Sequence, residues 1–457
     1  MAGHGARVTM TEGPLLGILI RVAVPIALSN LFLSAHDIVN AFWVGRLGEA
    51  PIAAVAASGP LFNVLISLGS GLSTAGAVLI AQNAGARRFD ALDHVAAQTL
   101  LMVAAMAIGF TAIGAAGTPA ALRLIGVEPA IGDLARDYLA VRYAAMVPMF
   151  AFIAIQAMLQ AVGEVRFAML IQFGSVLLNA LLDPLLIFGL GPVPGFGVVG
   201  AAMATVIAQV AALAIVLHHI LSGRSALHLR LNHFRPDLAQ FRLTIGLGLP
   251  ASIEQAIRTF SSLLLMALAA TFGTIGLAAY GVGTRLLFFW FTPMIGLSIA
   301  TASVVGQNIG AGRPDRAEAA SRLSAWLGFG VMTAVGLALV PVVPAITRAL
   351  APGEAEVIRH ASTFAMIYCP FLGVLTVPQA LLGAFRGAGS TRQSMVLSIV
   401  MQWLFQLPSA WLLALATPLG LLGIWWSFPI ANIAATILCL IWFRHGAWRR
   451  SLVASPA

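Results

Sequence analysis

Charge is the scarcest property of this sequence. Only 9% of the 457 residues are charged, while 60% are hydrophobic. An ordinary soluble domain is roughly 25% charged. Lysine is absent altogether: the 25 residues counted as lysine or arginine are all arginine. So few charges exclude a soluble globular protein and indicate a chain embedded in a lipid bilayer.

Cysteine is nearly as rare. The two cysteines, Cys369 and Cys439, lie far apart and have no metal-binding spacing, which excludes a disulfide scaffold and a zinc module. We expect both to pack inside helices, and we expect no cofactor. The sequence also lacks a His-Glu-x-x-His zinc motif and the Tyr-Asp and Gly-x-Gly-Asp pairs of membrane aspartyl proteases. A membrane-embedded hydrolase is therefore the weakest of the alternatives, and we expect no enzyme.

Long uncharged runs are what the sequence has in abundance. The run 50–86 contains no charged side chain, and about 20 apolar residues suffice to cross a bilayer. The segment 1–13 is too polar and too short for a signal peptide, so we expect the first helix to be retained. The runs predict an all-α polytopic membrane protein with twelve transmembrane helices, near residues 14–46, 51–83, 91–117, 134–162, 165–190, 197–221, 241–271, 275–308, 316–350, 357–386, 390–416 and 421–444.

The arginines gather in alternate loops of this twelve-helix arrangement. Cytoplasmic loops carry an excess of basic residues, so this distribution places both termini on the cytoplasmic side of the inner membrane. The net charge of +9 comes from these loops. We therefore expect the lipid bilayer, and no nucleic acid, as the partner of the basic residues. The loops that carry them are 87–88, 166, 224–242, 313–316, 392 and 444–450.

An internal repeat divides the chain into two halves. LIAQNAGARRFD at 79–90 matches VVGQNIGAGRPD at 304–315 without a gap, and Pro25 matches Pro250 at the same offset. Each half holds six predicted helices, an even number, so both halves enter the membrane in the same direction. Such parallel repeats form two pseudo-symmetric lobes related by an axis along the membrane normal, as in two-lobed transporters.

The repeat sets the expected domain boundaries. We expect an N-lobe over residues 1–222, a basic cytoplasmic linker over 223–240 and a C-lobe over 241–457. Because the two lobes of such a protein already form a complete unit, we expect it to work as a monomer.

Three acidic residues lie at membrane depth: Asp37, Asp183 and Glu254. An aspartate at a helix centre costs about 2.5–3.5 kcal/mol on insertion scales, so each is a candidate functional residue. The alternative for each is a polar contact that holds helices together.

Asp37 has polar neighbours at helical spacing. Asn30 and Ser34 precede it by seven and three residues, which places all three on one helix face. Asn30 is therefore a candidate member of a cation or proton site at Asp37. His36 is adjacent in the sequence and is therefore predicted to point away from this face, as a packing or interfacial residue.

Asp183 has a similar environment. Asn179 lies one helical turn before it, and Pro184 deprives the carbonyl of Ala180 of a hydrogen bond. Thr205 in the next helix could add a hydroxyl. Carboxylate, amide and carbonyl oxygens are hard ligands that suit Na⁺, and a carboxylate held away from water can also carry a proton. The sequence leaves H⁺ and Na⁺ both open.

Glu254 has two interpretations. Arg258 follows it by four residues, so the two side chains can form an ion pair along one helix face. Alternatively Glu254, with its neighbours Gln255 and Arg258, forms a site for substrate or for a second cation in the C-lobe. We keep both.

Four segments together resemble the multidrug and toxic compound extrusion (MATE) family of prokaryotic transporters. The likeness covers nearly the whole chain, with an Asp in helix 1 and an Asn-x-x-x-Asp-Pro in helix 5. The segments are VNAFWVGRLGEAPIAAVA at 39–56, NALLDPLLIFG at 179–189, GFGVVGAAMATVIAQ at 195–209 and FRGAGSTRQSM at 385–395.

The resemblance implies a cation-coupled antiporter that exports organic, often cationic, compounds. It implies that Asp37, Asn179 and Asp183 form an N-lobe site for H⁺ or Na⁺, joined by Thr205 and Tyr138. The family branch with a C-lobe cation site carries a further acid in helix 10, where this chain has TVPQALLG at 376–383. A lipid-linked oligosaccharide flippase of the same superfamily is the alternative, although such flippases line their cavity with arginines.

Overall fold

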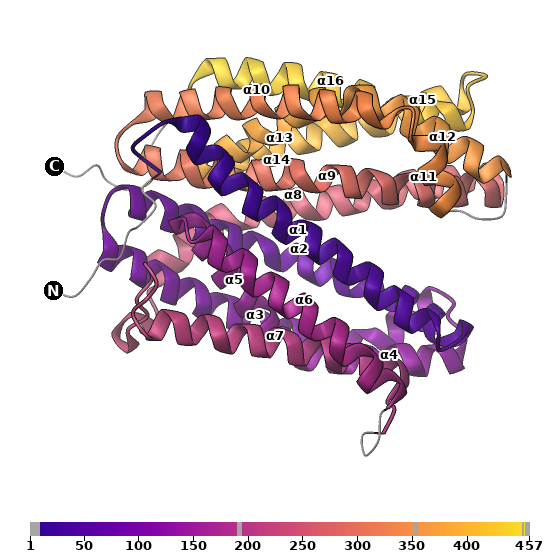
Figure 1. The fold of residues 1–457 in the computed structure, drawn as a ribbon, viewed down its shortest axis with the longest axis horizontal. Helices are drawn as coiled ribbons and strands as arrows, with labels where there is room; N and C mark the ends of the chain where they lie inside the picture. The colour runs from indigo at the N-terminus through magenta and orange to yellow at the C-terminus, as the bar shows by residue number, and fades with distance from the viewer. Residues whose placement is uncertain (1–9, 190–193, 351–354, 450–451, 453–457) are drawn as a thin grey trace. The chain divides into compact units, whose positions relative to one another are not determined.

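The computed structural model describes residues 10–189, 194–350, 355–449 and 452. Over these residues the chain forms helices and no strand (Figure 1). The connections between the predicted helices near 165–190 and 197–221, and between those near 316–350 and 357–386, lie partly outside the described residues. The helices are α1 (Leu15–Gly45), α2 (Glu49–Gly85), α3 (Phe89–Leu124), α4 (Pro129–Ala144), α5 (Met146–Val162), α6 (Val165–Phe188), α7 (Gly197–Leu221), α8 (Leu238–Ala270), α9 (Gly273–Gly310), α10 (Pro314–Leu339), α11 (Val343–Leu350), α12 (Ala355–Tyr368), α13 (Leu372–Gly387), α14 (Thr391–Ile399), α15 (Leu407–Leu415) and α16 (Leu421–His445).

The number of spans agrees with the prediction. Within the described residues, eleven spans are long and apolar enough to cross a membrane, and the bent pair α4 and α5 makes a twelfth. Some predicted helices consist of several pieces: α12, a short 3₁₀ turn (Cys369–Phe371) and α13 make one span, while α14, a π-helical segment (Val400–Gln406) and α15 make another. The all-α, twelve-span prediction is confirmed.

The bend of 54° between α4 and α5 has a local cause. Pro148 lies in the first turn of α5, where its missing N–H is not needed by the helix. It leaves the end of α4 without one of its usual backbone donors. The hydroxyl of Thr111 on α3 donates to the carbonyl of Tyr143 at 2.8 Å and stabilises the break.

The chain divides into two compact units. In the described part, unit 1 holds residues 28–252, and unit 2 holds residues 10–27 and 253–452. The divisions within α1 and α8, at Ala27/Leu28 and Ser252/Ile253, fall at equivalent positions of the sequence repeat, just after Pro25 and its counterpart Pro250. The contact-based units therefore follow the repeat, while the lobes at 1–222 and 241–457 with their linker stay a prediction.

Equivalent helix ends in the two units have the same geometry. The side-chain amide of Asn83 donates to the carbonyl of Leu79 at 2.8 Å, and that of Asn308 donates to the carbonyl of Val304 at 2.7 Å. Arg87 has a left-handed φ of 56°, and its repeat equivalent is a glycine, Gly312, with a φ of 69°. The turn that follows each helix thus has the conformation that favours glycine, even where the first half carries an arginine.

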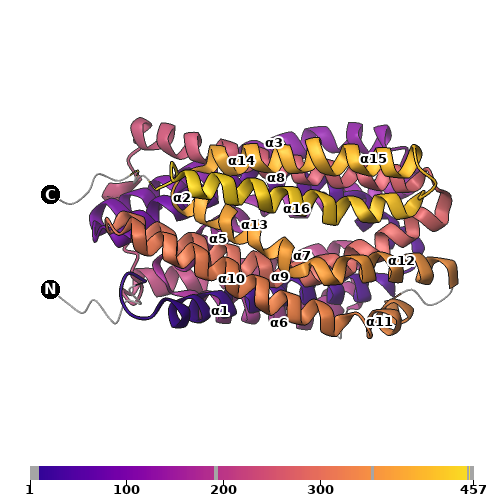
Figure 2. The same cartoon turned by 90° about the horizontal axis from the view of Figure 1, so that it is seen from above.

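Each unit has its own hydrophobic core. In unit 1, Phe150 on α5 is fully buried among α2, α3 and α5. In unit 2, Phe364 on α12 stacks on Trp425 of α16 with ring centroids 4.4 Å apart. Figure 2 shows α16 running beside α14 and α15, in agreement with their contacts. These cores position the polar residues described below.

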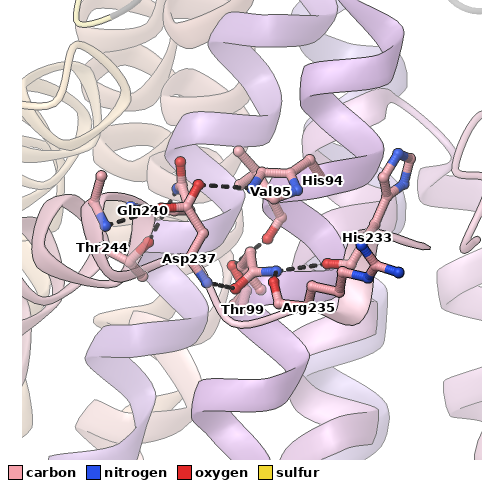
Figure 3. A network of polar contacts seen from close by, with 10 residues as sticks. His94, Val95, Thr99, His233, Arg235, Asp237, Gln240 and Thr244 are labelled. Carbon is pink, nitrogen blue, oxygen red and sulfur yellow. Dashed lines mark hydrogen bonds and ion pairs between the residues drawn. The ribbon is translucent and has the colours of Figure 1, made fainter. Parts of the chain in front are cut away.

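The predicted linker is fixed to unit 1 by polar side chains (Figure 3). The carboxamide of Gln98 on α3 donates to the carbonyls of His233 and Arg235, and it accepts from the backbone N–H of Asp237 at 3.0 Å. The Asp237 carboxylate lies 3.1 Å from His94 Nε2. It also accepts from the backbone N–H groups of residues 239 and 240, and so caps the start of α8.

Asp237 makes the stability of this region pH-dependent. The backbone N–H of Gln240 and the side chain of His94 hold the pKa of Asp237 below its ordinary value. A carboxylate with a lowered pKa stabilises the folded state above its unfolded pKa of about 3.9, and the benefit is lost as the pH falls through the folded value. We expect Asp237→Asn to lower the thermal unfolding temperature slightly at pH 6. The difference from wild type should shrink as the pH falls below the unfolded value of about 3.9, and a difference that stays constant at acid pH would contradict this account.

Candidate cation site

Three buried polar side chains meet between α6 and α7 in unit 1. The amide nitrogen of Asn179 lies 3.3 Å from Asp183 Oδ1 and 3.4 Å from Thr205 Oγ1. Asp183 is 0% exposed, Asn179 1% and Thr205 3%. Asn179 and Asp183 lie one turn apart on α6, and Thr205 faces them from α7. We call these residues the polar cluster.

The polar cluster has unused oxygen ligands. Asp183 Oδ2 and Asn179 Oδ1 are buried and have no hydrogen-bond partner within the described structure. An unpaired buried carboxylate oxygen is expensive, so such atoms are expected to have a partner of some kind. A carboxylate oxygen and an amide oxygen close together form a hard donor set that fits Na⁺, and the same carboxylate oxygen can accept a proton.

The two α1 residues predicted for this site, Asp37 and Asn30, make no described hydrogen bond to the polar cluster. Asp37 is exposed on α1. Across the described residues of unit 1, no hydrogen bond or ion pair joins it to Asn179 or Asp183. Asn30 lies on the same helix, where its backbone carbonyl accepts from Ser34 at 3.2 Å and its amide nitrogen is buried without a partner. The roles of Asp37 and Asn30 stay predictions.

The structure adds two residues that the sequence reasoning missed. His36 lies within interaction distance of Asn179, although it was predicted to point away as a packing residue. Arg142 on α4 interacts electrostatically with Asp37, and its guanidinium donates to the hydroxyl of Tyr138 at 3.2 Å. Tyr138 is buried, and in the described structure it is joined to Arg142 and not to the polar cluster. The i,i+4 spacing of Tyr138 and Arg142 was the available signal.

In unit 2, Glu254 and Arg258 form an ion pair with a distance of 2.9 Å between Oε1 and Nη2. Both lie on α8 at i,i+4 spacing, as one of the two interpretations predicted. Glu254 is 3% exposed, and its second oxygen has no hydrogen-bond partner among the described residues. Gln255 is exposed, and its role in a substrate or second cation site stays a prediction.

Comparison with known proteins gives a family for this arrangement. The family model MatE matches residues 25–185 and 250–412, one segment within each half of the repeat. The chain is 28% identical over 434 residues to the probable multidrug resistance protein YoeA of Bacillus subtilis, covering 94% of this chain and 93% of that protein. It is 27% identical over 448 residues to the multidrug resistance protein NorM of Burkholderia vietnamiensis, covering 95% of each.

A solved structure has the same fold. A MOP superfamily transporter from Pyrococcus furiosus is similar with a TM-score of 0.92 and 25% identity, covering 98% of this chain and 100% of that one. The sequence match, the repeated halves and the fold agree over almost the full length. The chain therefore belongs to the MatE family of multi-span membrane transporters.

Proposed function

We propose that this transporter is a cation-coupled multidrug antiporter that exports organic compounds in exchange for H⁺ or Na⁺. The observation that supports the proposal most is the polar cluster, because Asp183 is fully buried and keeps a carboxylate oxygen without a partner in the described structure. Its relatives include proteins named for multidrug resistance. The coupling ion is a transported substrate, and no resident cofactor is proposed.

The coupling follows from differential binding. A cation can drive a conformational change only if it binds one state of the transporter more tightly than the other. Asp183 and Asn179 supply the cation ligands in α6, and Thr205 supplies a hydroxyl in α7. Asp37 and its electrostatic partner Arg142 are proposed to adjust the charge that an organic cation meets in the N-lobe. The hydroxyl of Tyr138 accepts a hydrogen bond from Arg142, and we propose that Tyr138 holds this guanidinium in place.

The proposed orientation puts both termini and the linker on the cytoplasmic side of the inner membrane. The arginines at 87–88, 166, 224–242 and 313–316 support this placement. The two lobes are proposed to alternate access to a central path, with the protein working as a monomer.

The experiment that tests the proposed function is gradient-driven transport by the purified protein in proteoliposomes. A panel of fluorescent organic cations is supplied with an imposed pH gradient, an imposed Na⁺ gradient, or neither. We expect accumulation against the substrate gradient with at least one of the two cations. Equal transport under all three conditions would show that the protein is not coupled.

Thr205 gives a graded test of the polar cluster. Thr205→Val keeps the shape of the side chain and removes its hydroxyl, which contacts Asn179. A lost hydrogen-bonding group typically costs about 1 kcal/mol, so we expect the cation concentration for half-maximal transport to rise by roughly fivefold. Thr363→Val is the matched control, because Thr205 and Thr363 each donate to the carbonyl four residues earlier, but Thr363 lies in α12. An unchanged cation dependence in Thr205→Val would argue against Thr205 as a ligand.

A further inference from the structure

Unit 2 contains a cavity of about 270 Å³. Its walls come from α8, α9, α12, the π-helical segment and α16. The polar groups among its walls are a guanidinium, hydroxyls and two carboxamides, and the described lining residues include no carboxylate. The side chains on which the following argument rests are Arg258, Ser261, Gln402, Gln406, Phe288 and Phe428.

Arg258 is only partly satisfied by Glu254. The ion pair uses a single nitrogen, Nη2, and one carboxylate oxygen. Arg258 Nε is buried without a hydrogen-bond partner in the described structure, and so is the hydroxyl oxygen of Ser261 on the same helix. A guanidinium has five N–H donors in a planar fork that matches a carboxylate. Two lining side chains of the cavity therefore keep unused hydrogen-bonding atoms.

The charge near Arg258 is positive. Arg386 on α13 is close enough to Arg258 to interact with it electrostatically, whereas the described ion pairs join Glu254 to Arg258 and not to Arg386. The acids of unit 1 have no counterparts here: the repeat equivalents of Asp37 and Asp183 are Ser262 and Ser409. The polarity of this cavity is thus opposite to that of the polar cluster.

The π-helical segment brings its two carboxamides into the same cavity. Gln402 and Gln406 both lie in this segment and are buried, at 3% and 9% exposed. π-Helical turns within α-helices occur frequently at functional sites, because the extra residue changes the direction of the side chains. The π-helical geometry does not depend on the nearby charges, and it places two hydrogen-bonding side chains in the wall of the cavity.

The remaining wall is aromatic. Phe288 and Phe428 line the cavity together with Tyr280 and Tyr368. Ligand sites are typically apolar concavities with a few polar groups that fix the orientation of the ligand. An aromatic wall beside one guanidinium suits a flat ring system that carries an anionic group.

We propose that this cavity is a substrate site for aromatic carboxylates, with Arg258 as the group that binds the carboxylate. The inference rests on the proposed export function, and it names a substrate class for unit 2 that differs in charge from organic cations. The carboxylate accepts from Arg258 and Ser261, the carboxamides of Gln402 and Gln406 contact its polar substituents, and the ring packs on the phenylalanines. Glu254 competes with the substrate for Arg258.

The test measures equilibrium binding to the purified full-length protein in detergent. The two probes have one ring system and opposite charge: 2-naphthoate and 2-naphthylmethylammonium. We expect wild type to bind 2-naphthoate at least tenfold more tightly than the cation. Arg258→Met should weaken naphthoate binding at least tenfold, and Glu254→Gln should strengthen it. Arg285→Met is the control, because Arg285 is exposed on α9 and does not line the cavity.

A double variant keeps the test decisive if Arg258→Met folds poorly. Glu254→Gln combined with Arg258→Met removes both buried charges, and it should also bind naphthoate at least tenfold more weakly than wild type. A preference of wild type for the cation, or unchanged naphthoate binding in the double variant, would overturn the proposal. Displacement of naphthoate by phosphatidylglycerol at an equal concentration would instead assign the site to a lipid headgroup. Because the assay uses no ion gradient, its outcome is separate from that of the coupling experiment.

Discussion

Asp183→Asn is expected to reduce gradient-driven transport by roughly 100-fold. Asparagine keeps the size of the side chain and can still contact Asn179, but it cannot carry a proton or supply a charged ligand to Na⁺. Coupling free energies between two sites are typically about 1–3 kcal/mol, or 5–150-fold, and removal of the only carboxylate of the polar cluster should remove most of that coupling. The measurement is the initial rate of substrate accumulation in proteoliposomes under an imposed cation gradient.

Asp133→Asn is the control for this substitution. Asp133 belongs to the same unit and is paired with Arg136, but its side chain is 68% exposed near the start of α4. Its replacement should leave transport close to wild type. If Asp183→Asn accumulated substrate as well as Asp133→Asn does, Asp183 would have no coupling role.

The second large effect is structural and concerns Gly387. Gly383 and Gly387 lie four residues apart on α13 and form a Gly-x-x-x-Gly pattern against α9. A Cβ at Gly387 would collide with the carbonyl oxygen of Ala302 and lie 2.8 Å from its Cα. These obstacles are backbone atoms, so they cannot move aside as a side chain would. Close helix crossings of this kind depend on small residues at the contact.

We therefore expect Gly387→Leu to destabilise the protein by about 3 kcal/mol or more, at the upper end of the range for overpacked sites. The measurement is the yield of monodisperse protein after detergent extraction, together with its unfolding temperature. Gly330→Leu on α10 is the control, because a Cβ there meets no atom within 4 Å. Equal yields from the two variants would mean that α9 and α13 do not require this close approach.

The membrane spans and the repeat could be predicted from the sequence because they depend on long-range averages. A charge-free run such as 50–86 has few alternatives to a transmembrane helix, and the gapless match of 79–90 to 304–315 is visible without knowledge of contacts. Part of the polar cluster could be predicted for a different reason. Asn179 and Asp183 lie one turn apart on a single helix, so their local spacing was enough to bring them together.

Contacts that depend on helix rotation could not be predicted. Helical periodicity predicts that His36 points away from the face of Asp37, whereas the packing of α1 against α6 brings it within interaction distance of Asn179. Arg142 lies within the predicted helix near 134–162, but the sequence does not show that the bend between α4 and α5 brings it within interaction distance of Asp37. The bend at Ala145 depends on Pro148 and on the hydroxyl of Thr111, which lies in another helix.

The π-helical segment at 400–406 is a further feature of this kind. Its sequence VMQWLFQ contains no glycine or proline, and Pro408, two residues beyond it, indicates an irregular helix but not a π-helical turn. The extra residue is accommodated through contacts with α15 and α16, so only the tertiary structure shows that Gln402 and Gln406 line one cavity.

The most direct test of the account is to let substrate drive the cation. Proteoliposomes are prepared with equal pH and equal Na⁺ on both sides, and an organic cation is then added outside. An internal pH dye and radioactive Na⁺ report on the two coupling ions. The account predicts that substrate entry moves H⁺ or Na⁺ outward in wild type and that Asp183→Asn loses this counter-movement. Substrate flux without movement of either ion in wild type, or full counter-movement in Asp183→Asn, would contradict it.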